Sequence, residues 1–225
     1  MIAALAAAPL VAAALVAAVL ALIVGGTGAL ARRFAWEPEA ARKVSHVAVG
    51  LAVLPLPWLF AHDAPVIVLA LVACAGLLAL RMVPALRARF GCALHGISRP
   101  SIGEFAFVGG VALAFALAHD HPAAYVAAIL TLAFGDAAAA LIGRRFGRHP
   151  YAVGHARKSF EGSCAFFAVA AVVCALLPGA GSIAAVAAFA LATTLAEAFA
   201  GDGFDNAAIP LAGLLALRLF TGVST

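Results

Sequence analysis

Eight apolar stretches follow one another along this chain, separated only by short polar connections. They run approximately over residues 2–24, 45–60, 65–82, 103–118, 123–142, 161–177, 182–200 and 205–222. Of the 225 residues, 66% are hydrophobic and 11% are charged, whereas a soluble domain has about 25% charged residues. Because a membrane-spanning helix needs about 20 mostly apolar residues, the pattern predicts an all-α, polytopic integral membrane bundle. We expect about eight transmembrane helices in a single transmembrane domain, residues 1–225.

Basic residues gather in alternate connections between these stretches. Thirteen of the fourteen lysines and arginines lie at or after the end of the first, third or fifth stretch, and Arg218 is the exception. The thirteen are Arg32, Arg33, Arg42, Lys43, Arg81, Arg87, Arg89, Arg99, Arg144, Arg145, Arg148, Arg157 and Lys158. Since lysine and arginine mark cytoplasmic loops, we expect these connections in the cytoplasm and both termini on the non-cytoplasmic side. The composition suggests a bacterial inner membrane.

Several features narrow the class of protein further. No run of basic residues interleaved with aromatic ones predicts nucleic-acid binding. The four cysteines show no Cys-x-x-Cys spacing, which argues against a disulfide or zinc framework. The first 24 residues lack a basic segment, which favours a first span over a cleaved signal peptide. We expect membrane lipids as surroundings, and the sequence leaves open whether the chain forms a homo-oligomer.

Arg42, Lys43 and His46 form a basic cluster at the start of the second stretch. They are spaced three and four residues apart, so a helix would present all three on one side. Two cations and an imidazole at a membrane surface suit a phosphate group. The alternative is anchoring to anionic lipid headgroups, which accounts for the cations but not for His46.

Glu104 follows Ser101, Ile102 and Gly103 at the start of the fourth stretch. A lone carboxylate inside the end of a membrane span is costly, which makes Glu104 a candidate functional residue. The alternative is a glutamate in the first helical turn, where the helix dipole favours it.

Asp136 lies about two turns inside the cytoplasmic end of the fifth stretch. Burial of an unpaired carboxylate at that depth costs several kcal/mol, so an acidic residue there is a functional candidate. Mg²⁺ is a natural partner because it binds through one or two carboxylates together with water and substrate phosphates.

The loop after Asp136 is rich in glycine and basic residues. Arg144, Arg145, Arg157 and Lys158 could hold a polyphosphate, and the glycines permit close backbone approach. Ser159 and Glu161 follow directly, with Lys158 and Glu161 three residues apart and hence on one helical face. The alternative is ordinary positive-inside topology with a buried Asp–Arg pair, but topology alone does not require Ser159 or Glu161.

Three carboxylates and an amide crowd the connection between the last two stretches: Glu197, Asp202, Asp205 and Asn206. Like charges repel unless a cation lies among them, and a metal ion or the arginines of the preceding loop would supply one. The alternative is a solvated acidic turn. Together, the clusters place a basic cradle and several carboxylates on one predicted membrane face, which suits metal-assisted phosphoryl or nucleotidyl transfer to a lipid.

At these residues the sequence resembles the dolichol kinase, phytol kinase and diacylglycerol kinase family of CTP-dependent membrane lipid kinases, which is related to the CDP-diacylglycerol synthases. The ordered matches run from about residue 42 to 210. They are Arg42-Lys43-x-x-His46, Gly103-Glu104, Gly135-Asp136-x-x-Ala-x-x-x-Gly143-Arg144-x-Phe-Gly147, Lys158-Ser159-x-Glu161-Gly162-Ser163, Glu197 and Asp205-Asn206-x-x-x-Pro210.

The resemblance implies that Asp136 and the segment 158–161 form a nucleotide and metal site that Asp205 and Asn206 complete. It also implies CTP as the phosphoryl donor. The C-terminal signature of the CDP-diacylglycerol synthases, with Lys-Asp and Pro-Gly-His-Gly-Gly elements, is absent, which argues for a kinase. The short chain looks more like the phytol and small polyprenol kinases than the longer dolichol kinases.

The leading hypothesis is therefore a CTP-dependent kinase that phosphorylates the hydroxyl of an isoprenoid or related lipid alcohol. The basic residues of both clusters would bind the nucleotide, with Ser159 and Glu161. Asp136, Asp205 and Glu197 would bind Mg²⁺, Asn206 and Asp202 would complete the site, and Glu104 or His46 would orient or deprotonate the acceptor. The alternatives are a cytidylyltransferase acting on a lipid phosphate and a small membrane transporter built around Asp136.

Overall fold

A computed structural model describes residues 8–86, 102–176 and 182–221. The chain divides into two compact units, Met1–Pro100 and Ser101–Thr225, and each unit is treated by itself. Arg87, Arg89 and Arg99 of the predicted basic loops, and Ser101, lie outside the described residues. The single transmembrane domain stays a prediction.

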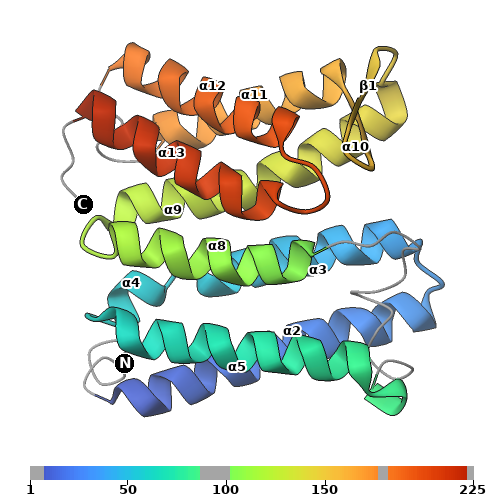
Figure 1. The fold of residues 1–225 in the computed structure, drawn as a ribbon, viewed down its shortest axis with the longest axis vertical. Helices are drawn as coiled ribbons and strands as arrows, with labels where there is room; N and C mark the ends of the chain where they lie inside the picture. Colours follow the sequence, from blue (N-terminus) through green and yellow to red (C-terminus); the bar gives the residue numbers. More distant parts are fainter. Residues whose placement is uncertain (1–7, 87–101, 177–181, 222–225) are drawn as a thin grey trace. The chain divides into compact units, whose positions relative to one another are not determined.

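The described residues of the first unit form the helices α2 (Pro9–Arg33), α3 (Pro38–Val53), α4 (Leu56–Leu59) and α5 (Asp63–Met82), drawn in blue to green-cyan in Figure 1. Proline lies in the first turn of α2, α3 and α4, where its fixed φ is compatible with a helix and its missing N–H costs nothing. Helix α2 packs against both α3 and α5. A hydrogen bond of 3.3 Å from the Thr27 hydroxyl to the Ser45 hydroxyl joins α2 to α3.

The second unit holds the remaining helices and a short hairpin. In chain order these are α8 (Gly103–Ala118), α9 (Pro122–Leu130), the π-helix η1 (Thr131–Gly135), α10 (Asp136–Phe146), β1 (Pro150–Val153), β2 (Ala156–Ser159), α11 (Phe160–Leu176), α12 (Ile183–Phe199) and α13 (Asp205–Thr221). Helix α13 packs against α8 and α12, and α11 packs against α10 and α12 (Figure 1). The core of the second unit includes four fully buried aromatic rings, those of Phe115, Tyr125, Phe166 and Phe189.

Each predicted apolar stretch is helical over most of its described residues, which confirms the mostly helical, all-α class. Among the described residues, three helices are long and apolar enough to cross a membrane: α2, α5 and the continuous run Pro122–Phe146. Helices α8, α11 and α12 are apolar but shorter. The number of eight spans and the orientation of the termini stay predictions.

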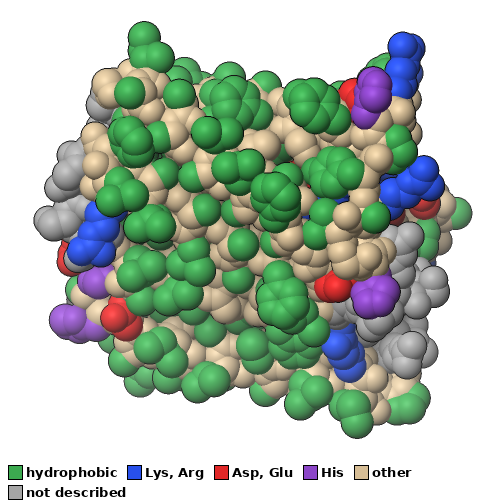
Figure 2. Space-filling view, turned by 45° about the horizontal axis from the view of Figure 1, so that its top comes forward, with side chains coloured by type: hydrophobic (Ala, Val, Ile, Leu, Met, Phe, Trp, Pro, Cys, Tyr) green, Lys and Arg blue, Asp and Glu red, His purple; other side chains and the backbone are tan. Residues whose placement is uncertain are grey.

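Large apolar side chains lie on the outside of these helices. At least 65% of the surface is exposed on each of four such side chains: Leu22, Leu71, Ile183 and Leu219. In Figure 2, hydrophobic side chains cover much of the visible surface, and charged or histidine side chains are few on it. Apolar surface of this extent marks contact with an apolar environment, and the chain is therefore a membrane protein.

Two local features were not predicted from the sequence. The fifth apolar stretch contains a π-helical turn, Thr131–Gly135, directly before Asp136. The basic loop after it forms an antiparallel hairpin in which Tyr151 pairs with Lys158 and Val153 with Ala156. The prediction that Lys158 and Glu161 share one helical face is therefore wrong, because Lys158 belongs to β2 and α11 begins at Phe160. Strands of four residues are too short to show in hydrophobic periodicity.

Candidate active site

The β1–β2 hairpin separates two basic residues that the sequence grouped together. Successive side chains of a strand point to opposite faces. Arg157 is accordingly exposed, whereas Lys158 lies on the inner side with its side chain 11% exposed. The two cations therefore lie on opposite faces of the strand, and their joint binding of a triphosphate stays a prediction.

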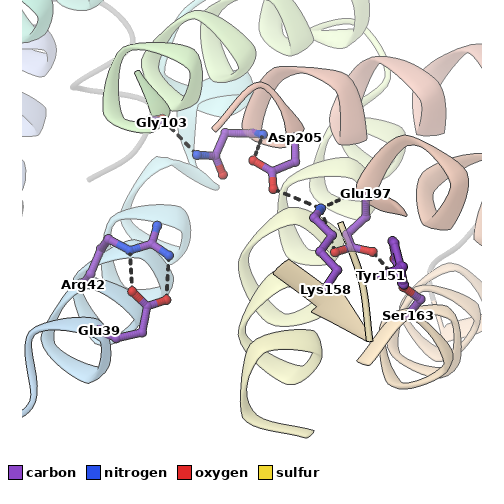
Figure 3. A network of polar contacts seen from close by, with 9 residues as sticks. Glu39, Arg42, Gly103, Tyr151, Lys158, Ser163, Glu197 and Asp205 are labelled. Carbon is purple, nitrogen blue, oxygen red and sulfur yellow. Dashed lines mark hydrogen bonds and ion pairs between the residues drawn. The ribbon is translucent and has the colours of Figure 1, made fainter. Parts of the chain in front are cut away.

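Lys158 lies between two carboxylates from different helices (Figure 3). Its Nζ is 2.9 Å from Oε1 of Glu197 and 3.4 Å from Oδ2 of Asp205, and it also donates to the Glu197 carbonyl oxygen. Glu197 belongs to the last turn of α12 and Asp205 begins α13. The three residues lie 39 and 47 positions apart in sequence, so folding rather than local structure assembles this triad.

The charge state of Lys158 follows from this environment. Burial acts to lower the pKa of its ammonium group, but the Glu197 and Asp205 carboxylates outweigh that effect and raise the pKa above its ordinary value. Asp136 adds a smaller effect in the same direction. Lys158 is therefore a fixed cation at neutral pH, and it cannot serve as a general base.

Glu197 is the most buried charge in the site, with a side chain only 6% exposed. One carboxylate oxygen accepts the Lys158 ion pair, and the other accepts a hydrogen bond of 3.2 Å from the Ser163 hydroxyl. Ser163 lies 2.6 Å from the Tyr151 hydroxyl of β1. Both oxygens of Glu197 are thus engaged by the protein, which compensates the cost of burying this charge.

Asn206 ties the start of α13 to the start of α8. Its side-chain amide donates to the Gly103 carbonyl oxygen at 2.9 Å, and its backbone amide donates to Oδ1 of Asp205 at 3.0 Å. Gly110 permits this close approach, because a Cβ there would collide with the Asn206 carbonyl oxygen. Glu104, the residue after Gly103, is half-buried in the first turn of α8. Asn206 therefore links the position of Asp205 to that of Glu104.

Ser159 and Glu161 make local contacts around the start of α11. The Ser159 hydroxyl accepts the Gly162 amide at 3.1 Å, a typical N-capping arrangement. Gly143 and Gly147 of the preceding segment pack on Ser159, where a Cβ would come within 2.9 Å of its hydroxyl oxygen. Glu161 lies 2.7 Å from Nδ1 of His149. The glycines of the motif thus join α10 to α11.

The remaining predicted residues of this unit occupy the edges of the site. Asp136 begins α10 and is half-buried. Arg144 and Arg145 lie in the last turn of the same helix and are exposed, with the Arg145 guanidinium 5.5 Å from the centre of the Phe146 ring. Asp202 lies in the turn between α12 and α13 and contacts the tip of the hairpin through His155.

The predicted metal ligands differ in how well they suit a divalent cation. Within the described ranges, no group of three or more His, Cys, Asp or Glu side chains is arranged to hold a metal ion. Mg²⁺, however, often takes one or two carboxylates and receives its other ligands from water and phosphate. Asp136 and Asp205 are half-buried carboxylates that fit this need. Both oxygens of Glu197 and both oxygens of Asp205 already have partners in the protein. Glu197 fits less well than Asp205, because its side chain is only 6% exposed against 19% for Asp205.

The basic cluster of the first unit lies on one helix, as expected. Arg42, Lys43 and His46 all belong to α3. Arg42 forms an ion pair with Glu39 at 2.7 Å, one helical turn away (Figure 3). Joint action of these residues with those of the second unit stays a prediction.

Sequence reasoning missed three contributors to the site, Tyr151, His149 and His155. In the first unit, it missed Glu39 as the partner of Arg42. The two histidines and Tyr151 lie on or beside the hairpin, and without that hairpin their partners were not predictable. Glu39 had a readable signal, because it lies three residues before Arg42 and an opposite charge at that spacing pairs on a helix.

Comparison with known proteins defines the class to which this fold and site belong. No family model and no solved structure matches the chain. A phytol kinase from Synechocystis sp. is 33% identical over 199 residues, which cover 84% of this chain and 83% of that protein. The chain is a membrane protein related over most of its length to a lipid kinase. It belongs to the phytol kinase family.

Proposed function

We propose that this protein is a CTP-dependent kinase that phosphorylates the hydroxyl of a lipid alcohol, an isoprenoid such as phytol, farnesol or a polyprenol. The observation that carries the proposal is the fixed cation Lys158, held between the carboxylates Glu197 and Asp205 in a member of the phytol kinase family. Apolar helix surfaces beside this charged site suit an acceptor with a hydrocarbon tail.

The reaction would proceed by attack of the acceptor hydroxyl oxygen on the γ-phosphorus of the nucleotide. The new P–O bond forms, the bond to the bridging oxygen breaks, and CDP leaves with the electron pair of that bond. The hydroxyl proton passes to a base, for which Glu104 and His46 are the candidates. Phosphoryl transfer depends mainly on positioning and charge stabilisation, so the decisive contribution of the chain is its arrangement of charges.

The residues of the second unit would have different roles in binding the phosphates and the metal ion, according to their positions. Lys158 would supply a buried positive charge near the phosphates, since its ammonium group already has three oxygen partners in Glu197 and Asp205. Arg144, Arg145 and Arg157 would offer exposed guanidinium groups as donors to the phosphate oxygens. Asp136 and Asp205 would hold Mg²⁺, which neutralises charge on the phosphates when it is bound. Asn206 would fix the position of Asp205 relative to Glu104, because it bonds to both Asp205 and Gly103.

The site would face the cytoplasm of a bacterial inner membrane, where CTP is available. The alternate placement of basic residues supports this orientation through the positive-inside rule. The nucleotide would enter from water while the acceptor tail remains among the helices.

The test uses protein purified in detergent with Mg²⁺ and CTP labelled at the γ-phosphate. Phytol, farnesol, longer polyprenols and diacylglycerol are offered as acceptors, and ATP is compared as donor. We expect label in the lipid product, release of CDP, and loss of both in Asp136→Asn. Pyrophosphate release with a lipid phosphate as acceptor would instead establish a cytidylyltransferase. Turnover retained in a folded Asp136→Asn variant would remove Asp136 from the mechanism.

A further inference from the structure

The tip of the β1–β2 hairpin lies against the turn that connects α12 to α13. The His155 amide donates to Oδ1 of Asp202 at 3.2 Å, and the His155 Nδ1 lies 3.3 Å from both carboxylate oxygens. Gly154 has φ +57, and a Cβ there would come within 2.8 Å of Oδ2 of Asp202. A Cβ on Gly201 would come within 2.7 Å of the Val153 carbonyl oxygen. The tip and the turn are thus in close backbone contact.

Asp202 itself has an uncommon backbone conformation. Its φ is 56, in the left-handed region that residues other than glycine adopt infrequently and that aspartate tolerates better than most. Its carbonyl oxygen accepts the Ile102 amide at 3.3 Å, and Gly203, with φ 94, completes the turn. This conformation directs the Asp202 carboxylate to the hairpin tip.

The segment from the end of α12 to the start of α13 contacts the hairpin at two places, at His155 and at Lys158. Glu197 precedes the turn and Asp205 follows it, and these two residues hold Lys158 on the inner side of β2. Asp202 lies between them in sequence and holds His155, three residues before Lys158. Two attachments on one hairpin restrain its rotation better than one.

We propose that Asp202 is a positioning residue: its carboxylate holds the hairpin tip and thereby keeps Lys158 placed for the nucleotide phosphates. The catalytic consequence rests on the proposed function, whereas the attachment itself does not. The sequence had placed Asp202 among the charged residues completing the site. The contacts assign it to the hairpin instead.

The test compares Asp202→Gly with Asp202→Asn in the full-length protein. Glycine relieves the left-handed φ but removes the acceptor oxygen, whereas asparagine tolerates that φ and keeps one acceptor. Asp120→Asn is the matched control, because Asp120 is an exposed aspartate beside a histidine, 3.5 Å from His119, in a connection outside the site. Amide hydrogen exchange of residues 150–159 is measured without nucleotide, and KM and kcat are measured in the kinase assay.

We expect faster exchange at the hairpin amides in Asp202→Gly and a rise of about tenfold in nucleotide KM, in line with the loss of one charge-assisted hydrogen bond. The value of kcat should change much less, and Asp202→Asn should restore most of both readouts. Asp120→Asn should match the wild type in each. Rescue by asparagine separates positioning from general loss of stability, which the melting temperature of each variant also monitors.

Unchanged exchange in Asp202→Gly would overturn the attachment, whether or not any kinase activity is found. Faster exchange with an unchanged KM would overturn the positioning of Lys158. A higher Mg²⁺ requirement in Asp202→Asn, with normal exchange, would instead make Asp202 a metal ligand. If no nucleotide transfers phosphate to any alcohol, the proposed function fails while the exchange measurement still decides the attachment.

Discussion

The Lys158 ammonium lies 2.9 Å from the Glu197 carboxylate, and the two side chains are 11% and 6% exposed. This pair joins the hairpin to the end of α12, and Asp205 extends it to α13. A buried ion pair adds little stability compared with apolar residues of similar size, but removal of one partner leaves an uncompensated charge. Removal of one partner should therefore destabilise the protein much more than replacement of both partners by uncharged residues.

Lys158→Met should abolish turnover and lower the free energy of unfolding by about 3–5 kcal/mol, because Glu197 is left buried without a counter-charge. Thermal unfolding in detergent and the labelled-CTP assay measure the two effects. The double variant Lys158→Met with Glu197→Gln should regain much of the stability but none of the activity. Recovery of turnover in the double variant would show that Lys158 serves the fold alone.

Asn206→Ala should destabilise the second unit by about 1–3 kcal/mol, because the buried Gly103 carbonyl oxygen loses its donor. Turnover should fall further than stability predicts, since Glu104 follows Gly103 directly. The control is Thr194→Ala, which removes a half-buried hydroxyl bonded within its own helix at 2.6 Å. Equal effects of the two variants on kcat would contradict a link between Asn206 and the acceptor side of the site.

Ser159→Ala separates the capping role of Ser159 from its predicted role in nucleotide binding. Loss of an N-cap costs about 1 kcal/mol, and Ser182 provides a matched case because its hydroxyl accepts the Ala185 amide at 3.3 Å at the start of α12. Both alanine variants should lose similar stability, measured by thermal unfolding. The nucleotide KM should rise in Ser159→Ala alone. An equal nucleotide KM in the two variants would show that Ser159 caps α11 and does not bind the nucleotide.

Arg157→Gln should raise the nucleotide KM several-fold and leave the melting temperature unchanged, because Arg157 is exposed on the outer side of β2. Arg218→Gln is the control, since Arg218 is also exposed but lies in the last turn of α13. The comparison should be made at low salt, where exposed charges are least screened. A KM in Arg157→Gln equal to that of the control would exclude Arg157 from nucleotide binding.

Much of the second unit could be predicted because its information is local. Apolar runs located the helices, and charged residues at their ends marked the site in which Lys158, Glu197 and Asp205 do meet. The exact pairing could not be predicted, since it joins residues 39 and 47 positions apart. The distribution of basic residues predicts the membrane face on which such residues lie, but it does not predict which side chains contact one another.

The hairpin shows where sequence reasoning lacked a physical signal. Strands of four residues with Pro150, glycines and cations nearby give no apolar alternation, so Arg157 and Lys158 were predicted together as cations that hold a polyphosphate. Strand pleating instead sends Arg157 outward and Lys158 inward. Asp202 was similarly read as part of an acidic turn, because a left-handed φ at aspartate has no sequence signature of its own.

The π-helical turn before Asp136 makes the length of this segment as important as its composition. A π turn contains one more residue than the α-helical ladder accommodates. Deletion of one residue between Thr131 and Gly135 would remove the π turn and leave an unbroken α-helix in which Asp136 keeps nearly the same direction, because the extra residue occupies the wider turn. Deletion of one residue from the regular α-helix Pro122–Leu130 would instead rotate that helix by about 100° relative to Asp136, although every residue of the motif would remain present. We expect the first deletion to retain more activity than the second.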